Sequence, residues 1–185
     1  MARHLIEGHA IVSVEGAIAD AAGRVPDSLR NEADWALFQS RLDASALTVL
    51  GRLGHEANPN AMRRRRLVLS RGVEGLVRED DITFRLNPDT IPIGEALARL
   101  VPAGGRIAVV GGTGVFDAFL PIGYDTFWLA VATRARVPGG RPVFTGIASV
   151  AEAEARLVEM GLVVRARSVL DMRDGIELAV FRRDR

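Results

Sequence analysis

Short apolar runs alternate with amphipathic stretches along the chain, and this alternation predicts the order of its secondary structure. Apolar runs bounded by Gly, Pro, Asn or Asp are typical of buried strands, whereas apolar positions that recur every three to four residues indicate helices. We expect strands at residues 9–14, 46–50, 67–69, 82–86, 106–110, 125–133, 162–170 and 176–181. We expect helices at residues 31–42, 93–100, 115–120 and 149–160, and a loop rich in Gly and Ala at residues 15–25.

The order of these elements predicts the fold class. Strands and helices alternate until two final strands, which are joined at Asp174-Gly175, a dipeptide that favours a hairpin turn. Alternation of this kind is typical of an α/β protein with a mostly parallel sheet and helices on both faces. We therefore expect a single domain, residues 1–185, with a mixed central sheet that is mostly parallel and has an antiparallel C-terminal hairpin.

The apolar strand at 106–110 leads into a glycine-rich turn, Gly111-Gly112-Thr113-Gly114-Val115. Such a turn presents backbone N–H groups at a helix N-terminus with no side chains in front of them, which suits a phosphate group. A turn that merely requires glycine is one alternative. A Rossmann dinucleotide site is another, but its glycine motif usually follows the first strand. About a hundred residues precede this turn, so the rest of a Rossmann domain has no room behind it.

Two other predicted strands end in residues that are compatible with phosphate. Gly51-Arg52 follows the strand at 46–50, and Ser70-Arg71 follows the strand at 67–69. Ligands of parallel sheets collect at the carboxyl ends of the strands, and arginine binds phosphate in a bidentate manner. Either arginine alone could equally be a solvated surface residue, so the prediction depends on all three strand ends together.

Composition excludes several classes of site. The chain has a net charge of +1, no cysteine and no lysine, so all 24 basic residues are arginine. Disulfides, thiolate metal sites, Schiff bases and a P-loop lysine are therefore excluded, and a nucleic-acid partner is not expected. The three histidines lack metal-ligand spacing, so we expect no metal. We see no signal peptide and no membrane span, and we expect a cytoplasmic protein.

The motifs occur in an order that resembles the dihydrofolate reductase superfamily, including the reductase domain of riboflavin biosynthesis. The matching features are a strand and loop at 11–19, an acid four residues before a phenylalanine at Asp34 and Phe38, and the strand ends Gly51-Arg52 and Leu69-Ser70. The last feature is Gly111-Gly112, followed by a short helix and Phe119-Leu120-Pro121. The similarity extends from about residue 9 to residue 144.

The resemblance implies that the cofactor is NADPH. Residues that would bind its phosphates or its adenosine end are Gly51, Arg52, Ser70, Arg71, Gly111, Gly112, Thr113, Gly114 and Val115, and residues that would close over the nicotinamide are Ala17 and Ile18. The implied reaction is hydride transfer to a pterin- or pyrimidine-like heterocycle.

In this family the acid on the first helix binds the heterocycle and helps to protonate it, which assigns the catalytic role to Asp34. Phe38 lies on the same helix face, and Trp35 and Arg64 are the other candidates for substrate binding. Two alternatives remain open. Asp34 could instead stabilise the first turn of its helix by its charge, and the run Arg63-Arg64-Arg65-Arg66 could be a solvated loop before an apolar strand.

Several positions depart from the family pattern. Ala130 stands where dihydrofolate reductases have a threonine coupled to the acid, Phe116 where a tyrosine is common, and Gly54 where a threonine is expected. A reductase-like module that binds a nucleotide without catalysis, or a Rossmann-type dehydrogenase or epimerase, therefore remains an alternative. The expected partner is a small heterocyclic substrate, and a homodimer formed through the terminal hairpin is possible.

Overall fold

The computed structural model describes residues 3–184 and contains one large sheet with helices on both faces. The sheet has nine strands in the order β10-β11-β8-β1-β7-β3-β4-β6-β5, and a second sheet pairs β2 with β9. The strands are β1 (His4–Val12), β2 (Ala17–Ala19), β3 (Leu47–Gly51), β4 (Arg66–Leu69), β5 (Leu76–Arg78), β6 (Thr83–Leu86), β7 (Gly105–Val109), β8 (Thr126–Ala132), β9 (Arg141–Pro142), β10 (Leu162–Asp171) and β11 (Ile176–Arg183). The helices are α1 (Glu32–Asp43), α2 (Arg52–Ala57), α3 (Ile93–Leu100), α4 (Thr113–Phe119) and α5 (Val150–Glu159).

The centre of the large sheet is parallel and its two edges are antiparallel. Strand β1 pairs in parallel with β7 and β8, and parallel pairing continues through β3, β4 and β6. Strands β10 and β11 form the antiparallel C-terminal hairpin, and β5 is antiparallel to β6. The expected α/β class, with a mostly parallel sheet and a terminal hairpin, is therefore confirmed.

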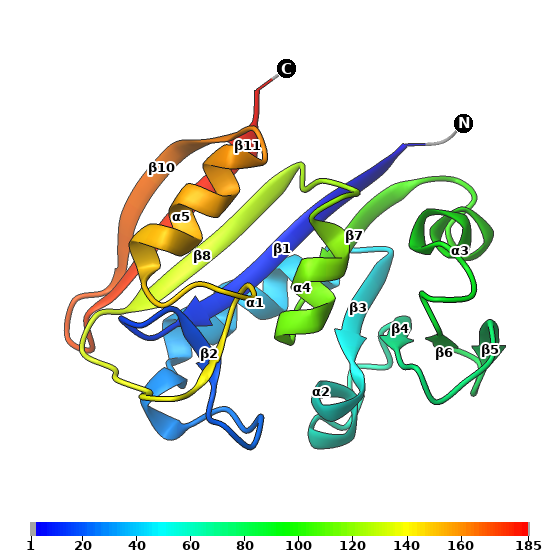
Figure 1. The fold of residues 1–185 in the computed structure, drawn as a ribbon, viewed down its shortest axis with the longest axis horizontal. Helices are drawn as coiled ribbons and strands as arrows, with labels where there is room; N and C mark the ends of the chain where they lie inside the picture. The colour runs from blue at the N-terminus through cyan, green and yellow to red at the C-terminus, as the bar shows by residue number, and fades with distance from the viewer. Residues whose placement is uncertain (1–2, 185) are drawn as a thin grey trace.

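Helices bury the apolar side chains of both sheet faces. Side chains of α3, α4 and α5 join the larger core cluster, which includes Val49, Ile107 and Phe127. On the opposite face, Leu37 of α1 packs against a smaller cluster that includes Ala130. Figure 1 shows α4 and α5 in front of the sheet and α1 behind it, and the arrows of β1 and β3 point to the lower edge, where α2 and β2 lie.

Local sequence signals account for most element boundaries. The Asn31 side chain caps α1 and the Ser149 side chain caps α5, where its oxygen accepts a hydrogen bond from the Glu152 N–H at 3.2 Å. Gly175, with a φ of 69°, allows the turn between β10 and β11. The structure adds α2 and the short strands β2, β5 and β9, and it begins β1 at His4 rather than at residue 9. Within residues 3–184, no helix combines the length and the apolar character needed to cross a bilayer.

Candidate functional site

The glycines at the ends of β3 and β7 meet at the carboxyl edge of the sheet. The Gly51 N–H donates a hydrogen bond to the Gly111 carbonyl over 2.9 Å. A Cβ atom on Gly51 would lie 3.4 Å from Val115 Cγ2 and 3.7 Å from the Gly112 nitrogen. Gly111 has a φ of +108°, a conformation that favours glycine. The structure thus brings together four residues that the sequence selected for a phosphate group: Gly51, Gly111, Gly112 and Val115.

The space in front of this glycine turn is open. A Cβ atom on Gly112 or Gly114 would have no neighbouring atom within 4 Å, whereas one on Gly111 would lie 3.9 Å from Ile18 Cδ1. Ile18 therefore lies beside the turn, as a residue covering a bound nucleotide would. Ala17 is 2% exposed, and its side chain belongs to the smaller core cluster. Of the two residues expected to close over the nicotinamide, Ile18 is thus placed near this turn, and Ala17 is part of the core.

The segment that carries Ile18 is anchored to the loop before α5. Strand β2 pairs with β9, and the Val143 N–H donates to the Gly16 carbonyl over 2.9 Å. The Thr113 hydroxyl donates to the Pro142 carbonyl, so this predicted cofactor residue also links α4 to β9. The loop at residues 15–25, which the sequence predicted to be flexible, is thus held in place at Gly16 and at β2.

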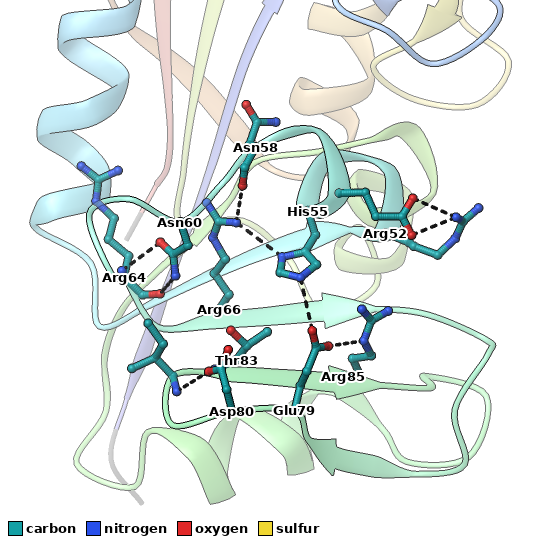
Figure 2. Close-up of polar contacts among 12 residues, drawn as sticks. Arg52, His55, Asn58, Asn60, Arg64, Arg66, Glu79, Asp80, Thr83 and Arg85 are labelled. Carbon is teal, nitrogen blue, oxygen red and sulfur yellow. Dashed lines mark hydrogen bonds and ion pairs between the residues drawn. The ribbon is translucent and has the colours of Figure 1, made fainter.

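The arginines that the sequence selected at this edge each contact a carboxylate of the protein. The Arg52 Nη1 atom lies 3.0 Å from each carboxylate oxygen of Glu56, and Figure 2 marks the two contacts of Arg52 with dashed lines. Arg71 lies 3.3 Å from Asp89, and its side chain is 85% exposed. Exposed ion pairs of this kind contribute little to stability, so both arginines can exchange their carboxylate for another anion. Ser70 Oγ accepts a hydrogen bond from the Gly72 N–H at 3.2 Å.

Asp34 lies in the first turn of α1, and its side chain is partly buried. The N-cap function belongs to Asn31, whose side-chain oxygen accepts hydrogen bonds from the N–H groups of Ala33 and Asp34 at 3.0 and 3.1 Å. Within residues 3–184, the structure records no hydrogen bond or ion pair to the Asp34 carboxylate. Burial raises the pKa of Asp34 to about 6. An acid with this pKa is partly protonated near neutral pH, as a proton donor requires.

Aromatic side chains surround the next turn of α1. The Phe38 ring lies 6.2 Å from the His9 ring of β1 and 5.5 Å from the Trp35 ring. Since Asp34 and Phe38 are four residues apart, they share the helix face that looks onto β1 and β8. Trp35, at 55% exposure, lies at the outer side of this group. The predicted substrate residues Asp34, Phe38 and Trp35 are therefore neighbours on one helix.

Arg64 contacts the same helix further along, where α1 ends. Its guanidinium donates to Asp43 Oδ1 at 3.0 and 2.6 Å and to Gln39 Oε1 at 2.7 Å. The side chain is 16% exposed. Arg64 thus lies beside the α1 face that carries Gln39 and Asp43, and its donors are already used by the protein.

A buried charged cluster that was not predicted from the sequence lies under α1. Glu7, 5% exposed, accepts hydrogen bonds from Arg41 at 2.8 and 3.1 Å and lies 2.7 Å from Arg106 Nε. Burial alone would raise the pKa of Glu7, but His9, Arg41 and Arg106 outweigh it and lower that pKa to about 2. His9 stacks on Trp128, with ring centroids 6.1 Å apart. Polar residues at alternate positions of an apolar strand, Glu7 and His9, were the available signal.

Within residues 3–184, no group of three or more acidic or histidine side chains is arranged to hold a metal ion. No family model matches the sequence, and the comparison with curated proteins gives no match. Comparison with solved structures gives clear matches. A protein assigned to riboflavin biosynthesis from Shewanella sp. PV-4 is 19% identical with a TM-score of 0.70, and the match covers 98% of this chain and 99% of that one.

Two further matches define the fold. Dihydrofolate reductase from Enterococcus faecalis, complexed with NADP(H), is 16% identical with a TM-score of 0.66, over 100% of this chain and 99% of that one. The diaminohydroxyphosphoribosylaminopyrimidine deaminase/5-amino-6-(5-phosphoribosylamino)uracil reductase from Thermotoga maritima is 19% identical with a TM-score of 0.67, and the match covers 98% of this chain and 57% of that one. The chain has the dihydrofolate reductase-like fold.

The three positions at which the sequence departs from the family pattern lie at different depths in this dihydrofolate reductase-like fold. Ala130, 1% exposed, pairs with Ile11 of β1 on the face covered by α1. Phe116, also 1% exposed, packs on the opposite face with its ring 5.6 Å from that of Phe127. Gly54 lies in α2, where an added Cβ would come no closer than 3.9 Å to Leu50. Ala130 is thus the departure on the sheet face that Asp34 and Phe38 cover.

Proposed function

We propose that the chain is an NADPH-dependent reductase that reduces a pterin- or pyrimidine-like heterocycle. The observation that carries this proposal is the partly buried Asp34 carboxyl group on α1, to which no residue within 3–184 donates a hydrogen bond, in a fold whose glycine turns meet at the carboxyl edge of the same sheet. Asp34 can hold and release a proton near neutral pH, and the glycine turn offers backbone N–H groups in open space. Together they would provide for the two parts of a reduction, namely proton transfer at Asp34 and binding of the hydride donor at the glycine turn.

The residues at the glycine turn fit a dinucleotide cofactor. Gly51, Gly112 and Gly114 leave space that side chains would fill, and Arg52 is exposed next to them. We assign the phosphates to these backbone groups and to Arg52, the adenosine end to Ser70 and Arg71, and the nicotinamide side to Ile18. When bound, NADPH would supply a hydride. The protein residues would orient the two rings and exclude water from between them.

Asp34 would act on the substrate rather than on the cofactor. Its protonated form donates a hydrogen bond and a proton to a ring nitrogen, and its ionised form accepts a hydrogen bond from an amino group of the heterocycle. A pKa of about 6 allows both forms to be populated under mild conditions. Phe38, one turn further along α1, would pack on the flat ring. Hydrogen bonding by Asp34 and packing by Phe38 together support a flat heterocycle with a polar edge as substrate.

The fold neighbours support the same reaction class. The Enterococcus faecalis enzyme is a dihydrofolate reductase complexed with NADP(H), and the Thermotoga maritima protein is named as a uracil reductase. This chain spans a little over half of the latter, so we extend to it only the reduction step of that protein. The pterin and pyrimidine classes both remain within the proposal.

A second candidate function is a nucleotide-binding module without catalysis. One observation favours it: Ala130 contributes no hydroxyl group on the sheet face that Asp34 and Phe38 cover, and no other side chain within residues 3–184 forms a hydrogen bond or ion pair with the Asp34 carboxylate. A module of this kind would bind NADPH and reduce nothing. The two functions therefore differ in turnover and not in cofactor binding.

The test is a titration with NADPH, followed by NADPH oxidation with dihydrofolate, deaminated flavin precursors and small carbonyl compounds. We expect binding and turnover of one heterocycle, and we expect Asp34→Asn to lower turnover by about a hundredfold or more while NADPH binding is kept. Gly51→Ala should weaken NADPH binding, because its Cβ would fill the space beside Gly112. Gly94→Ala in α3 is the control, because it adds the same methyl group away from the turn, where its Cβ would have no neighbour within 4 Å.

Absence of NADPH binding would overturn the proposal. Binding without turnover of any compound would favour the non-catalytic module. Unchanged turnover of Asp34→Asn would leave the reductase class intact and remove Asp34 as the acid.

A further inference from the structure

The side-chain amide of Asn31 joins the start of α1 to the turn between β10 and β11. Its Oδ1 atom accepts hydrogen bonds from the N–H groups of Ala33 and Asp34 at 3.0 and 3.1 Å. Its Nδ2 atom donates to Asp171 Oδ2 at 2.9 Å and to Asp174 Oδ2 at 3.2 Å. One side chain thus contacts both the helix that carries Asp34 and a residue that lies 140 positions further along the chain.

Asp171 divides its two carboxylate oxygens between the turn and Asn31. Its Oδ1 atom accepts hydrogen bonds from the N–H groups of Arg173 and Asp174 at 2.9 and 3.1 Å, whereas its Oδ2 atom accepts the one from Asn31. The hydrogen bond from Asn31 lowers the pKa of Asp171, and the hydrogen bonds from the two N–H groups lower it further. Asp171 is therefore ionised at neutral pH, and its hydrogen bond to Asn31 is charge-assisted.

The turn between β10 and β11 is itself fastened to the sheet. Thr133, which follows β8, donates to the Gly175 carbonyl through its N–H group at 2.9 Å and through its hydroxyl group at 2.8 Å. Figure 1 shows the turn at the lower end of β10 and β11, the end of the sheet at which the chain enters α1. Asn31 therefore connects the first turn of α1 to a fixed point beside β8, the strand that carries Ala130 on the face covered by this helix.

Buried side chains anchor α1 at its far end and just before its start. Residues 32–43, all of which the structure describes, include one fully buried side chain, that of Leu42. Leu29, in the segment before the helix, is also buried. Between these two leucines, Asn31 makes the hydrogen bonds that tie the first turn, and with it Asp34, to another part of the fold.

The position of this first turn matters for a proton donor. A general acid has to lie within about 2.6–3.2 Å of the atom that it protonates, and a displacement of about 1 Å can lower a rate by about a hundredfold. The Asp34 carboxylate has no hydrogen bond or ion pair of its own within residues 3–184, so its position depends on the backbone that carries it. The Asn31 Oδ1 atom holds that backbone directly, at the Asp34 N–H group.

We propose that Asn31 and Asp171 are positioning residues, which hold the first turn of α1 where the Asp34 carboxyl group reaches the substrate heterocycle. The assignment rests on the proposed function and adds to it two residues that act through Asp34 rather than on the substrate. The turn between β10 and β11 then influences turnover through Asn31, and Asp174 adds a second, longer contact to the same amide.

Asn31→Ser tests this proposal, because serine keeps the N-cap of α1 but lacks the amide group that reaches Asp171 and Asp174. In the full chain we expect Asn31→Ser to lower kcat by about tenfold or more and to leave NADPH binding unchanged. The pKa of Asp34, measured by NMR at its carboxyl carbon, should move from about 6 toward 3.8, because a first turn that is not held exposes the carboxyl group to water. Since the acid works in its protonated form, the alkaline limb of the pH–rate profile should move to lower pH as well.

Asp171→Ala is a second variant, which breaks the same link from the side of the hairpin. Asn31 remains the N-cap in this variant, so we expect the same changes in kcat and in the pKa of Asp34. Combination with Asn31→Ser should add little, because the two residues share one interaction. Asp27→Ala is the control: it removes an exposed acid that lies before α1 and pairs with Arg30, and it should leave both quantities unchanged.

The proposal is overturned if Asn31→Ser and Asp171→Ala keep the kcat and the Asp34 pKa of the wild type, even where their Tm falls, because the link would then serve stability alone. It is also overturned if Asp27→Ala changes both quantities as much as they do. The NMR titration needs no substrate, so its result does not depend on the proposed function. Failure of that function would show separately, as absence of NADPH binding or of turnover in the wild type.

Discussion

Glu7 and Asp34 are two shielded carboxylates between α1 and the same face of the sheet, and their environments differ completely. Glu7 is surrounded by Arg41, Arg106 and His9, and its pKa is lowered to about 2. Asp34 has no partner in residues 3–184, and burial raises its pKa to about 6. One acid is always ionised at neutral pH, and the other is ready to exchange a proton.

The difference separates a structural acid from a functional one. A buried carboxylate that is paired with two arginines fixes the helix on the sheet, because either charge alone would be costly to bury. A buried carboxylate left without a partner is destabilising, and such groups cluster at sites where chemistry or binding uses them. Pairs of acids whose environments move their pKa values apart are a common feature of active sites.

The largest effect is expected for Glu7→Gln. The amide cannot neutralise Arg41 and Arg106, so we expect a loss of about 3–5 kcal/mol in the free energy of unfolding at pH 7, measured with urea. Because the folded-state pKa of Glu7 is lowered from 4.5 to about 2, its contribution is present above pH 4.5 and is lost as the pH falls toward 2. The variant should therefore lack this part of the acid sensitivity of the wild type.

Glu95→Gln is the control for this change. Glu95 pairs with Arg99 on the exposed side of α3, and its removal should cost no more than about 0.5 kcal/mol. Equal losses in the two variants would mean that the buried cluster does not anchor α1.

Asp34→Asn should have the opposite sign. Because the folded-state pKa of Asp34 is raised from 3.8 to about 6, ionisation penalises the folded state as the pH rises through this range. The variant escapes that penalty, so we expect it to gain at most about 3 kcal/mol over the wild type between pH 4 and pH 8. Urea unfolding of both proteins at the two pH values measures the gain. A pH-independent difference would show that Asp34 is ordinarily solvated.

The smallest effect is expected for Trp128→Phe. The Arg41 guanidinium lies 4.6 Å from the centre of the Trp128 ring, and a phenyl ring attracts a cation less strongly than an indole. We expect a loss of about 0.5–1 kcal/mol at pH 7, and a smaller loss when the change is made together with Glu7→Gln. Strict additivity in this double-mutant cycle would mean that Trp128 and Glu7 do not hold Arg41 jointly.

Much of the fold could be predicted from local patterns, because its strands are apolar and two of its helices, α1 and α5, begin at side-chain caps. The caps at Asn31 and Ser149 and the hairpin at Asp174-Gly175 are examples. The start of β1 was missed because Glu7 is polar, and only the fold shows that Arg41 and Arg106 neutralise it. Helix α2 was missed because it is six residues long and contains Gly54.

The candidate site was predictable where it depends on strand ends. Gly51 and Gly111 were expected at one edge of the sheet, and the structure joins them by a hydrogen bond. The roles of Arg64, Arg65 and Arg66 could not be assigned from the sequence, because their partners lie on three different helices. Arg64 contacts Asp43 of α1, Arg65 donates to the Leu100 carbonyl of α3, and Arg66 lies 3.4 Å from His55 of α2. Likewise, the sequence alone left open whether Asp34 stabilises the first turn of its helix by its charge, and the structure keeps Asp34 in that turn, with Asn31 as the N-cap.

The most direct test of this account is a titration of the Asp34 carboxyl carbon by NMR, with Asp34→Asn used to assign its resonance. The account predicts a pKa of about 6, far above that of an ordinary aspartate. A titration centred near 3.8 would contradict it, because the carboxyl group would then be ionised throughout the neutral range and would have no proton to give.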